Sequence, residues 1–283
     1  MRKNILALLL SSFALLSFTS IKVEEIPTAR TILDGLFKSV ENAQTLAYEL
    51  DYSERKADGK YRKDSSNIKF QKTPFRVYMK MSTGAEVLWG PDMNDGDALI
   101  HPDAFPYINL NLSTTGSIMR KNQHHGIEAT GFAYFGSILK NVETKAGKAF
   151  DSRFLYLGEI TFNGFHCYNL VVLSTSFKYE PYTVLKGENL LTIAKKLFVN
   201  DYMIQIHNNL SSFSDVKAGQ VIMVPTDYAQ ELTLYIDKTT MLPVLIKVVD
   251  DKGLFEEYHF RKLKVNPAFS ANEFSKTFKD YHF

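Results

Sequence analysis

The sequence predicts an α+β protein whose main element is a large antiparallel sheet. Long stretches alternate apolar and polar residues, and turn signals such as Asp58-Gly59 and Asn163-Gly164 separate pairs of these stretches. Between such stretches, residues 182–225 place apolar side chains at spacings of three and four, which is typical of helices. We therefore expect a sheet that a small helical unit interrupts.

The first predicted element is a helix after Pro27, where apolar residues from Ile32 to Val40 share one helix face. A hairpin follows, with alternation from Leu46 to Tyr52 and a return strand through Ile68 and Phe70. The remaining elements are a strand over 75–81, a helical segment over 127–142, a hairpin over 154–173, and strands over 231–237, 242–249 and 254–265. The strand pattern thus resumes after the helical unit.

Residues 1–20 have the pattern of a secretory signal peptide. Arg2 and Lys3 precede an apolar run from Ile5 to Phe18, and cleavage is expected near Ser20. No later stretch has the roughly 20 apolar residues that a membrane-spanning helix needs. The sequence therefore predicts a protein that crosses the inner membrane and stays in the periplasm or cell envelope without spanning a membrane.

Charge and cysteine content narrow the possible partners. Removal of Arg2 and Lys3 would reduce the 33 basic side chains to 31, equal to the 31 acidic ones. A neutral chain has no general attraction to nucleic acid, so we expect no nucleic-acid partner. Cys167 is the only cysteine, which excludes a disulfide framework and leaves packing to hold the core.

The interrupting segment, residues 182–225, reads as strand, helix, helix, strand. It contains "YTVLKGENLLTIAKK", "NNL" and "KAGQVIMVP". In these residues it resembles a lysin-motif (LysM) domain, whose consensus has an aromatic-T-V strand, K-G-D-T-L, I-A-K, N-x-L and P-G-Q-x-L-x-V-P. Glu188 and Asn189 replace the usual Asp-Thr pair, and Ala218 replaces a frequent proline. The resemblance implies an inserted βααβ domain whose adjacent end strands join it to the host sheet.

LysM domains bind peptidoglycan or related N-acetylglucosamine glycans in a shallow groove. Carried over by position, the resemblance implies a glycan-binding groove made of Gly187, Glu188, Asn189, Leu190, Ile206, His207, Asn208 and Leu210. A different interpretation remains open, in which Leu190 and Ile206 are core residues and Asn208 only ends the second helix, because a motif can keep its fold without its function.

The host, residues 27–181 and 226–275, resembles the lipoprotein-carrier fold of outer-membrane lipoprotein sorting. The resemblance lies in "LTLYIDKTTMLPVLIKVVDDKGLFEEYHFRKLKVNPAF" and in the opening helix and hairpin. It implies a curved antiparallel half-barrel with helices on one side and a cavity for a hydrophobic ligand. A second resemblance, to the secreted bacterial domain-of-unknown-function 1571 family, lies in "GAEVLWGPDMNDGDALIHPD" and "MRKNQHHGIEATG" and implies the same fold.

The 21 Phe and 15 Tyr allow two interpretations: they could line such a cavity, or they could fill an ordinary core. Four side chains, His101, His124, His125 and Glu128, form the one cluster that could hold a metal or serve a peptidoglycan-modifying enzyme. Their spacing is irregular, and no nucleophile motif or acidic pair accompanies them, so we expect no metal, no cofactor and no enzymatic activity.

The sequence thus predicts a non-enzymatic envelope protein in which LysM binds peptidoglycan and the half-barrel binds a lipid, a lipoprotein or another hydrophobic ligand. The alternatives are a peptidoglycan-modifying enzyme that uses the His101, His124, His125 and Glu128 region, and a structural protein of envelope assembly.

Overall fold

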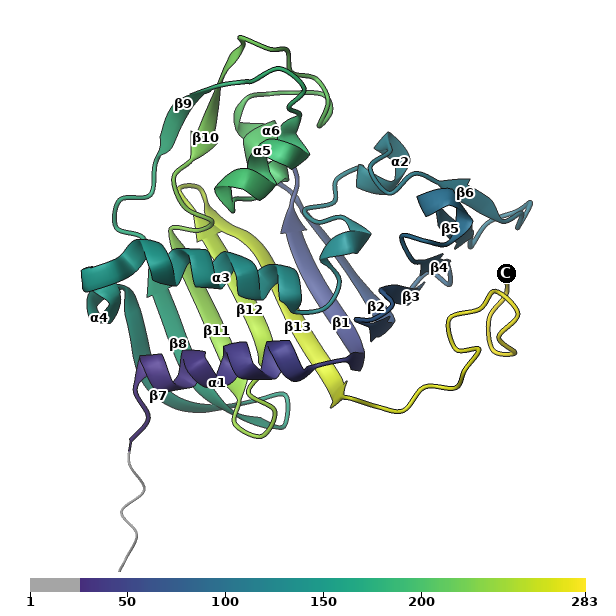
Figure 1. Ribbon diagram of the computed structural model, residues 1–283, viewed down its shortest axis with the longest axis horizontal. Coiled ribbons are helices and arrows are strands. Elements are labelled where there is room, and N and C mark those ends of the chain that lie inside the picture. The colour runs from purple at the N-terminus through teal and green to yellow at the C-terminus, as the bar shows by residue number, and fades with distance from the viewer. Residues whose placement is uncertain (1–25) are drawn as a thin grey trace, which may run out of the picture.

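The computed structural model describes residues 26–283. The predicted signal peptide, residues 1–20, lies outside the described residues. Eleven of the strands within residues 26–283 form one antiparallel sheet in the order β6-β5-β4-β3-β2-β1-β13-β12-β11-β8-β7 (Figure 1). These strands are β1 (Thr45–Arg55), β2 (Tyr61–Gln71), β3 (Arg76–Met81), β4 (Glu86–Trp89), β5 (Ala98–His101), β6 (Leu110–Leu112), β7 (Phe154–Phe162), β8 (Phe165–Leu173), β11 (Glu231–Asp237), β12 (Pro243–Asp250) and β13 (Gly253–Val265). The predicted large antiparallel sheet is confirmed.

Two long helices, α1 (Ala29–Asn42) and α3 (Ala133–Ala146), lie across the same face of the sheet (Figure 1). Thr28 caps α1 by accepting a hydrogen bond from the Thr31 backbone, and Leu33 and Leu36 on its apolar stripe are fully buried. Two single-turn helices, α2 (Ser117–Arg120) and α4 (Phe150–Arg153), flank α3 in the chain. None of the helices within residues 26–283 is long and apolar enough to cross a membrane.

The second helix starts later than the sequence predicted. Residues Ile127–Ala129 form a separate 3-10 turn, and α3 begins only at Ala133. Between them Gly131 has a φ of +88°, and a Cβ there would lie 3.0 Å from the ring of Phe70. Both the left-handed backbone and the close approach to the sheet require glycine, so this residue interrupts the predicted helix.

The predicted hairpin turns are confirmed. Asn163 and Gly164 have φ values of 49° and 84°, which suit the two-residue turn that pairs Phe162 with Phe165. Strands β1 and β2 pair along their whole length, from Thr45 with Gln71 to Arg55 with Tyr61. Because side chains alternate between faces along a strand, even-numbered residues of β1 point toward the helices, together with Glu256, Tyr258 and Phe260 of β13. A bulge in β13 opposite Ala47 to Glu49 then shifts the alternation, so that Val265 lies opposite Leu46.

Residues between β8 and β11 form a separate unit. Strands β9 (Tyr179–Thr183) and β10 (Val221–Pro225) pair only with each other, and α5 (Leu190–Leu197) and α6 (Asp201–His207) lie between them in the chain. Strands β8 and β11 nevertheless pair directly in the main sheet. The pairing of the end strands starts with Tyr179 opposite Pro225, three residues before the start of the predicted first strand. We call residues 179–225 the inserted unit.

The inserted unit packs firmly on the sheet. Two hydrogen bonds of 2.8 and 2.9 Å join the buried Arg120 guanidinium to the Asp201 carboxylate at the start of α6. The ring of Tyr202 stacks on His124 at 4.7 Å, and its hydroxyl accepts a hydrogen bond from the Ala57 backbone N–H. Buried residues of the unit and of the main sheet belong to one continuous core. The inserted unit and the sheet are therefore packed together.

The C-terminal segment covers the outer face of β2 to β4. Tyr281 stacks on Tyr78 with ring centroids 3.6 Å apart, and the ring and backbone of His282 bond the buried carboxylate of Glu86. Lys69 forms an ion pair with Glu273. This segment, after β13, was not expected from the sequence, because its aromatic residues have no helical or strand period.

Candidate functional site

The inner face of the sheet and the chain from α2 to α3 line a cavity of about 370 Å³. Its wall is mainly apolar and is built by strands β1 to β6, β12 and β13. Representative apolar lining residues are Leu50, Ile68, Met79, Val87, Ile118 and Phe135. A cavity of this size and character suits one small hydrophobic molecule. The aromatic content of the chain therefore serves both a packed core and a cavity wall, since Tyr48 and Phe260 also line it.

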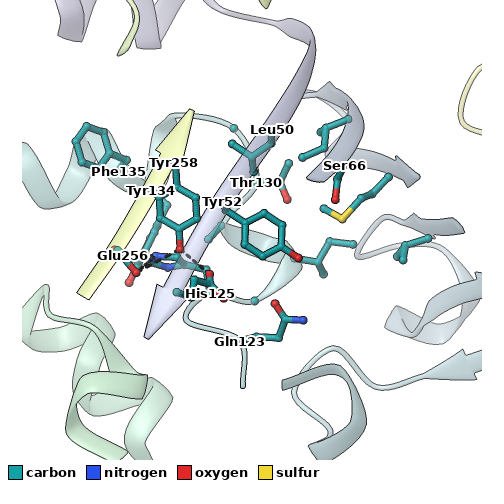
Figure 2. Close-up of a pocket in the computed structure, with 18 of the residues that line it drawn as sticks. Leu50, Tyr52, Ser66, Gln123, His125, Thr130, Tyr134, Phe135, Glu256 and Tyr258 are labelled. Atoms are coloured by element: carbon teal, nitrogen blue, oxygen red, sulfur yellow. Dashed lines mark hydrogen bonds and ion pairs between the residues drawn. The ribbon is translucent and has the colours of Figure 1, made fainter. Parts of the chain in front are cut away.

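One end of the cavity is polar. Strand β1 brings Tyr52 and Glu54 to the cavity, and β13 brings Glu256 and Tyr258. Figure 2 shows Tyr52, Glu256 and Tyr258 at this end. The two strands pair with Glu54 opposite Glu256, so the two carboxylates are neighbours across the ladder. We call the side chains at this end, including His125 from the covering chain, the polar end of the cavity.

Glu256 is the most highly bonded group of the polar end. Its carboxylate accepts a hydrogen bond from Tyr228 Oη at 2.7 Å, and Tyr258 Oη lies 3.2 Å away, although the single Tyr258 proton has a nearer acceptor in Glu54 at 2.6 Å. The Nδ1 of His124 lies 2.8 Å and the Nε2 of His125 lies 3.2 Å from Glu256 Oε2. Glu256 is 1% exposed, so the donors Tyr228, His124 and His125 replace the water that a buried carboxylate loses.

The network sets the charges of its members. Burial favours the neutral carboxyl group, but the charge and N–H groups of His125 and His124 outweigh it and hold the pKa of Glu256 well below its usual range. Burial also disfavours the imidazolium of His125, yet the Glu256 charge outweighs this and raises the pKa of His125. Burial, followed by the charge of Glu256, raises the pKa of Tyr228 and Tyr258, so both hydroxyls stay neutral donors.

His124 is a structural member of this network. Its Nε2 lies 2.9 Å from the backbone carbonyl oxygen of Arg55, and its Nδ1 faces the carboxylate. Both neighbours are acceptors only, so both ring nitrogens are placed to donate. The ring is fully enclosed between Phe255 and Tyr202, at centroid distances of 4.1 and 4.7 Å. His124 therefore ties the sheet to the inserted unit.

The second carboxylate, Glu54, is less completely bonded. Its Oε1 accepts a hydrogen bond of 2.6 Å from Tyr258 Oη. Its Oε2 lies 3.6 Å from Nη1 of Arg62 and accepts no hydrogen bond from any residue in 26–283. Arg62 in turn donates from Nη2 to the hydroxyl of Tyr52 at 2.5 Å.

The four residues predicted as a possible metal or catalytic cluster do not come together. His101 lies on β5 and bonds the side chain of Asn109 at 2.9 Å. Glu128 lies in the 3-10 turn and forms no hydrogen bond or ion pair with the described residues, whereas His124 and His125 bond Glu256. Within residues 26–283 no group of three or more His, Cys, Asp or Glu side chains has the geometry of a metal site. The His-rich region is an ion-pair network in this structure.

The sequence reasoning singled out His124 and His125 but missed Glu54 and Glu256. Glu256 follows His124 by 132 residues, so no local spacing could join them. A weaker signal was present: Glu54 continues the alternation of Leu46, Tyr48, Leu50 and Tyr52 with a charged residue where an inward-facing apolar residue is expected.

The predicted glycan-binding residues lie around the start of α5 and the end of α6. Gly187 and Glu188 precede α5, Asn189 caps it, and His207 and Asn208 stand at the end of α6. Several of them have structural partners. Glu188 accepts hydrogen bonds from Tyr182 Oη and the Leu185 backbone at 2.9 Å, and the ring of His207 stacks on Tyr179 at 3.5 Å.

Two of these residues are held by the fold of the inserted unit. The Leu190 side chain is fully buried, so it is not available to a glycan. The Asn208 amide donates to the backbone oxygens of Ile204 and Met223 and accepts from the Met223 N–H, at 2.7 to 2.8 Å. Ile206 and Leu210 are partly buried against the core, and Gly187 is exposed. Any glycan contact would therefore come from exposed backbone at Gly187 and the outer edges of the remaining side chains.

Known structures share the general arrangement of a large curved sheet with few helices. A chain of the MucA/MucB complex from Pseudomonas aeruginosa has a TM-score of 0.43 at 14% identity, over 87% of this chain and 60% of that one. LppX, a lipoprotein of Mycobacterium tuberculosis, has a TM-score of 0.38 at 8% identity, over 86% and 99%. A putative outer membrane lipoprotein-sorting protein domain from Vibrio parahaemolyticus has a TM-score of 0.34 at 10% identity, over 88% and 98%.

These likenesses are distant, and this chain spans only 59% to 62% of the length of the MucB chains. They describe an arrangement of strands and helices and carry no conclusion about function. No protein-family model and no curated protein matches the chain. The resemblances to LysM and to the domain-of-unknown-function 1571 family therefore stay predictions.

Proposed function

We propose that this chain is a non-enzymatic protein of the bacterial cell envelope that holds a small hydrophobic ligand in its sheet cavity. The observation that carries the proposal is the cavity of about 370 Å³, whose wall is apolar and whose one end is polar. A lipid combines an apolar chain with a polar head, and so does the lipid anchor of a lipoprotein.

The cavity is tested by filling it. Ile68 is 3% exposed and lines the cavity, so an Ile68→Trp variant places a large ring inside it. The matched control is Asn67→Trp, because Asn67 is the preceding residue on β2 and faces outward. We expect Ile68→Trp to lose binding of the neutral dye N-phenyl-1-naphthylamine and of any lipid extracted with the purified protein, whereas Asn67→Trp keeps both.

Equal binding by the two variants would contradict the cavity assignment. Overpacking also costs stability, about 1–3 kcal/mol, so circular dichroism and thermal unfolding are needed to show that Ile68→Trp is folded. Mass spectrometry of organic extracts from the wild-type protein identifies any ligand that is bound.

We further propose that the inserted unit is a LysM domain that places the protein on peptidoglycan. The supporting observations are the strand, helix, helix, strand order and the pairing of its two end strands. The predicted groove is tested at Gly187, which has a φ of +86° and open space around its Cα. Asparagine tolerates this backbone conformation, so Gly187→Asn adds a side chain to the groove with little strain.

The matched control is Gly164→Asn in the β7–β8 turn, where φ is +84° and an added Cβ would have no atom within 4 Å. In co-sedimentation with purified peptidoglycan we expect Gly187→Asn to remain in the supernatant and Gly164→Asn to pellet like the wild type. If both variants pellet, the assignment of the groove is wrong. If neither the variants nor the wild type pellets, the proposed peptidoglycan binding is wrong.

A further inference from the structure

We propose that the cavity selects a lipid whose head group is uncharged and carries hydroxyl groups, and that Glu54 recognises it by accepting a hydrogen bond. This inference rests on the proposed binding of a hydrophobic ligand and names the chemical class of its head. A monoacylglycerol has such a head, whereas a fatty acid at neutral pH carries a carboxylate.

The first observation is the Oε2 atom of Glu54, which has an ion-pair neighbour but no hydrogen-bond donor. This side chain is 4% exposed and lines the cavity, yet its Oε2 accepts no hydrogen bond from residues 26–283. Arg62 Nη1 lies 3.6 Å away, beyond hydrogen-bond distance. A buried carboxylate oxygen without a donor is unfavourable, and a ligand that donates an O–H at this point removes the penalty.

The second observation is the charge balance of the polar end. The two carboxylates, Glu54 and Glu256, already face the Arg62 guanidinium and the imidazole rings of His124 and His125. Arg62 is engaged, because Nη2 donates to Tyr52 and Nη1 points to the Asn122 carbonyl at 3.4 Å and to Glu54. An anionic head next to Glu54 Oε2 would meet like charge without a free cation, so it is disfavoured.

The third observation is a set of polar side chains with unused hydrogen-bonding capacity. Gln123, Thr130 and Tyr134 line the same cavity (Figure 2), and their side chains form no hydrogen bonds within the described part of the chain. Together with Glu54 they offer both donors and acceptors. A head with several hydroxyl groups matches this mixture, since each hydroxyl both donates and accepts.

The test compares two lipids that share one chain. Monododecanoylglycerol and dodecanoate are titrated below their micelle concentrations, at pH 8, to displace N-phenyl-1-naphthylamine from the wild-type protein. We expect the glyceride to reach half-displacement at about tenfold lower concentration, the effect of one hydrogen bond to a charged group. In Glu54→Gln, which keeps the shape but loses the charge, this ratio should fall to within about threefold.

Two further variants separate recognition from folding. Glu257→Gln is the matched control, because Glu257 lies on β13 beside Glu256 but faces away from the cavity and bonds His259. It should keep the tenfold ratio. Tyr134→Phe retains the ring and removes one hydroxyl, and it should weaken the glyceride several-fold while leaving dodecanoate unchanged.

The outcomes are distinct. Equal affinity of the two lipids, or a preference for dodecanoate, overturns the head-group inference and leaves the cavity function standing if the dye binds. A tenfold ratio that survives in Glu54→Gln overturns the role of Glu54. If neither dye nor lipid binds the folded wild type, the proposed function falls and the inference falls with it.

Discussion

The two ends of the cavity differ although the same strands build them. On β1, Leu50 contributes to the apolar wall, and Glu54, four residues later on the same face, belongs to the polar end. Alternation along a strand fixes which face a side chain occupies. It does not decide whether a charge on that face is stable, because the donors that stabilise Glu256 come from His124, His125 and Tyr228 in other parts of the chain.

The ends also differ in what they contact beyond the cavity. The polar end reaches the inserted unit, since His124 stacks on Tyr202 and its backbone carbonyl accepts a 3.4 Å hydrogen bond from Asn200. The apolar wall is covered by the chain leading into α3. Changes at the polar end are therefore expected to affect the whole molecule, and changes at the apolar wall to affect mainly the ligand.

The largest effect is expected for Glu256→Gln. The change removes the charge that the two histidines face, and breaking a buried ion pair in this way costs about 3–5 kcal/mol. Urea unfolding measures the loss. Glu257→Gln, on the outer face of the same strand, should change the free energy of unfolding by less than about 0.5 kcal/mol. Similar losses in both variants would show that the network does not stabilise the fold.

A smaller effect is expected where apolar side chains are shortened. Leu36 is fully buried in α1 away from the cavity, so Leu36→Ala should cost about 2–5 kcal/mol. Met79 lines the cavity and already has empty space on one side, so Met79→Ala should cost only about 1 kcal/mol. Thermal or urea unfolding of the pair checks the order. The reverse order would mean that the cavity wall is packed like a core.

Gly131→Ala should cost about 1–3 kcal/mol. The substitution forces a side chain into a left-handed backbone and places its Cβ 3.0 Å from Phe70, which anchors the covering chain to the sheet. The unfolding free energy measures the cost, and dye binding should weaken because the cover is displaced. Gly164→Ala has a similar φ but open space, so it isolates the backbone part of the cost. An equal loss in both would rule out the contact with Phe70.

The smallest expected effect is a pH dependence of stability. The pKa of His125 is raised in the folded protein, so its contribution is complete below the unfolded value of about 6.5 and is lost as pH rises through the folded pKa. The pKa of Glu256 is lowered, so its contribution is complete above about 4.3 and is lost only as pH falls through its folded pKa. Stability from this pair should be greatest at about pH 5–6.

Urea unfolding between pH 5 and 9 checks this expectation. A decline in stability toward pH 9 that disappears in His125→Gln would show that His125, at the polar end of the cavity, causes it. A decline that is unchanged in this variant would assign the pH dependence to a group other than His125.

Several elements were predictable because their signals are local. The α1 helix, the β1–β2 hairpin and the Asn163-Gly164 turn follow from period and turn residues. The predicted helix over 127–142 was displaced, since Gly131 serves a contact with a distant strand. Of the polar end, His124 and His125 were noticed as a pair, but their partner was not. The glycan-binding residues and the domain boundaries stay predictions.

By itself the sequence determined the α+β class, the antiparallel pairing of neighbouring strands and the strand, helix, helix, strand order of the inserted unit. These features depend on residues within a few positions of one another. Only the tertiary structure decided that β1 lies beside β13, which places Glu54 opposite Glu256, and that His124 reaches both strands. The physical reason is that a buried carboxylate is stabilised by whichever donors surround it, and folding brings those donors from distant parts of the chain.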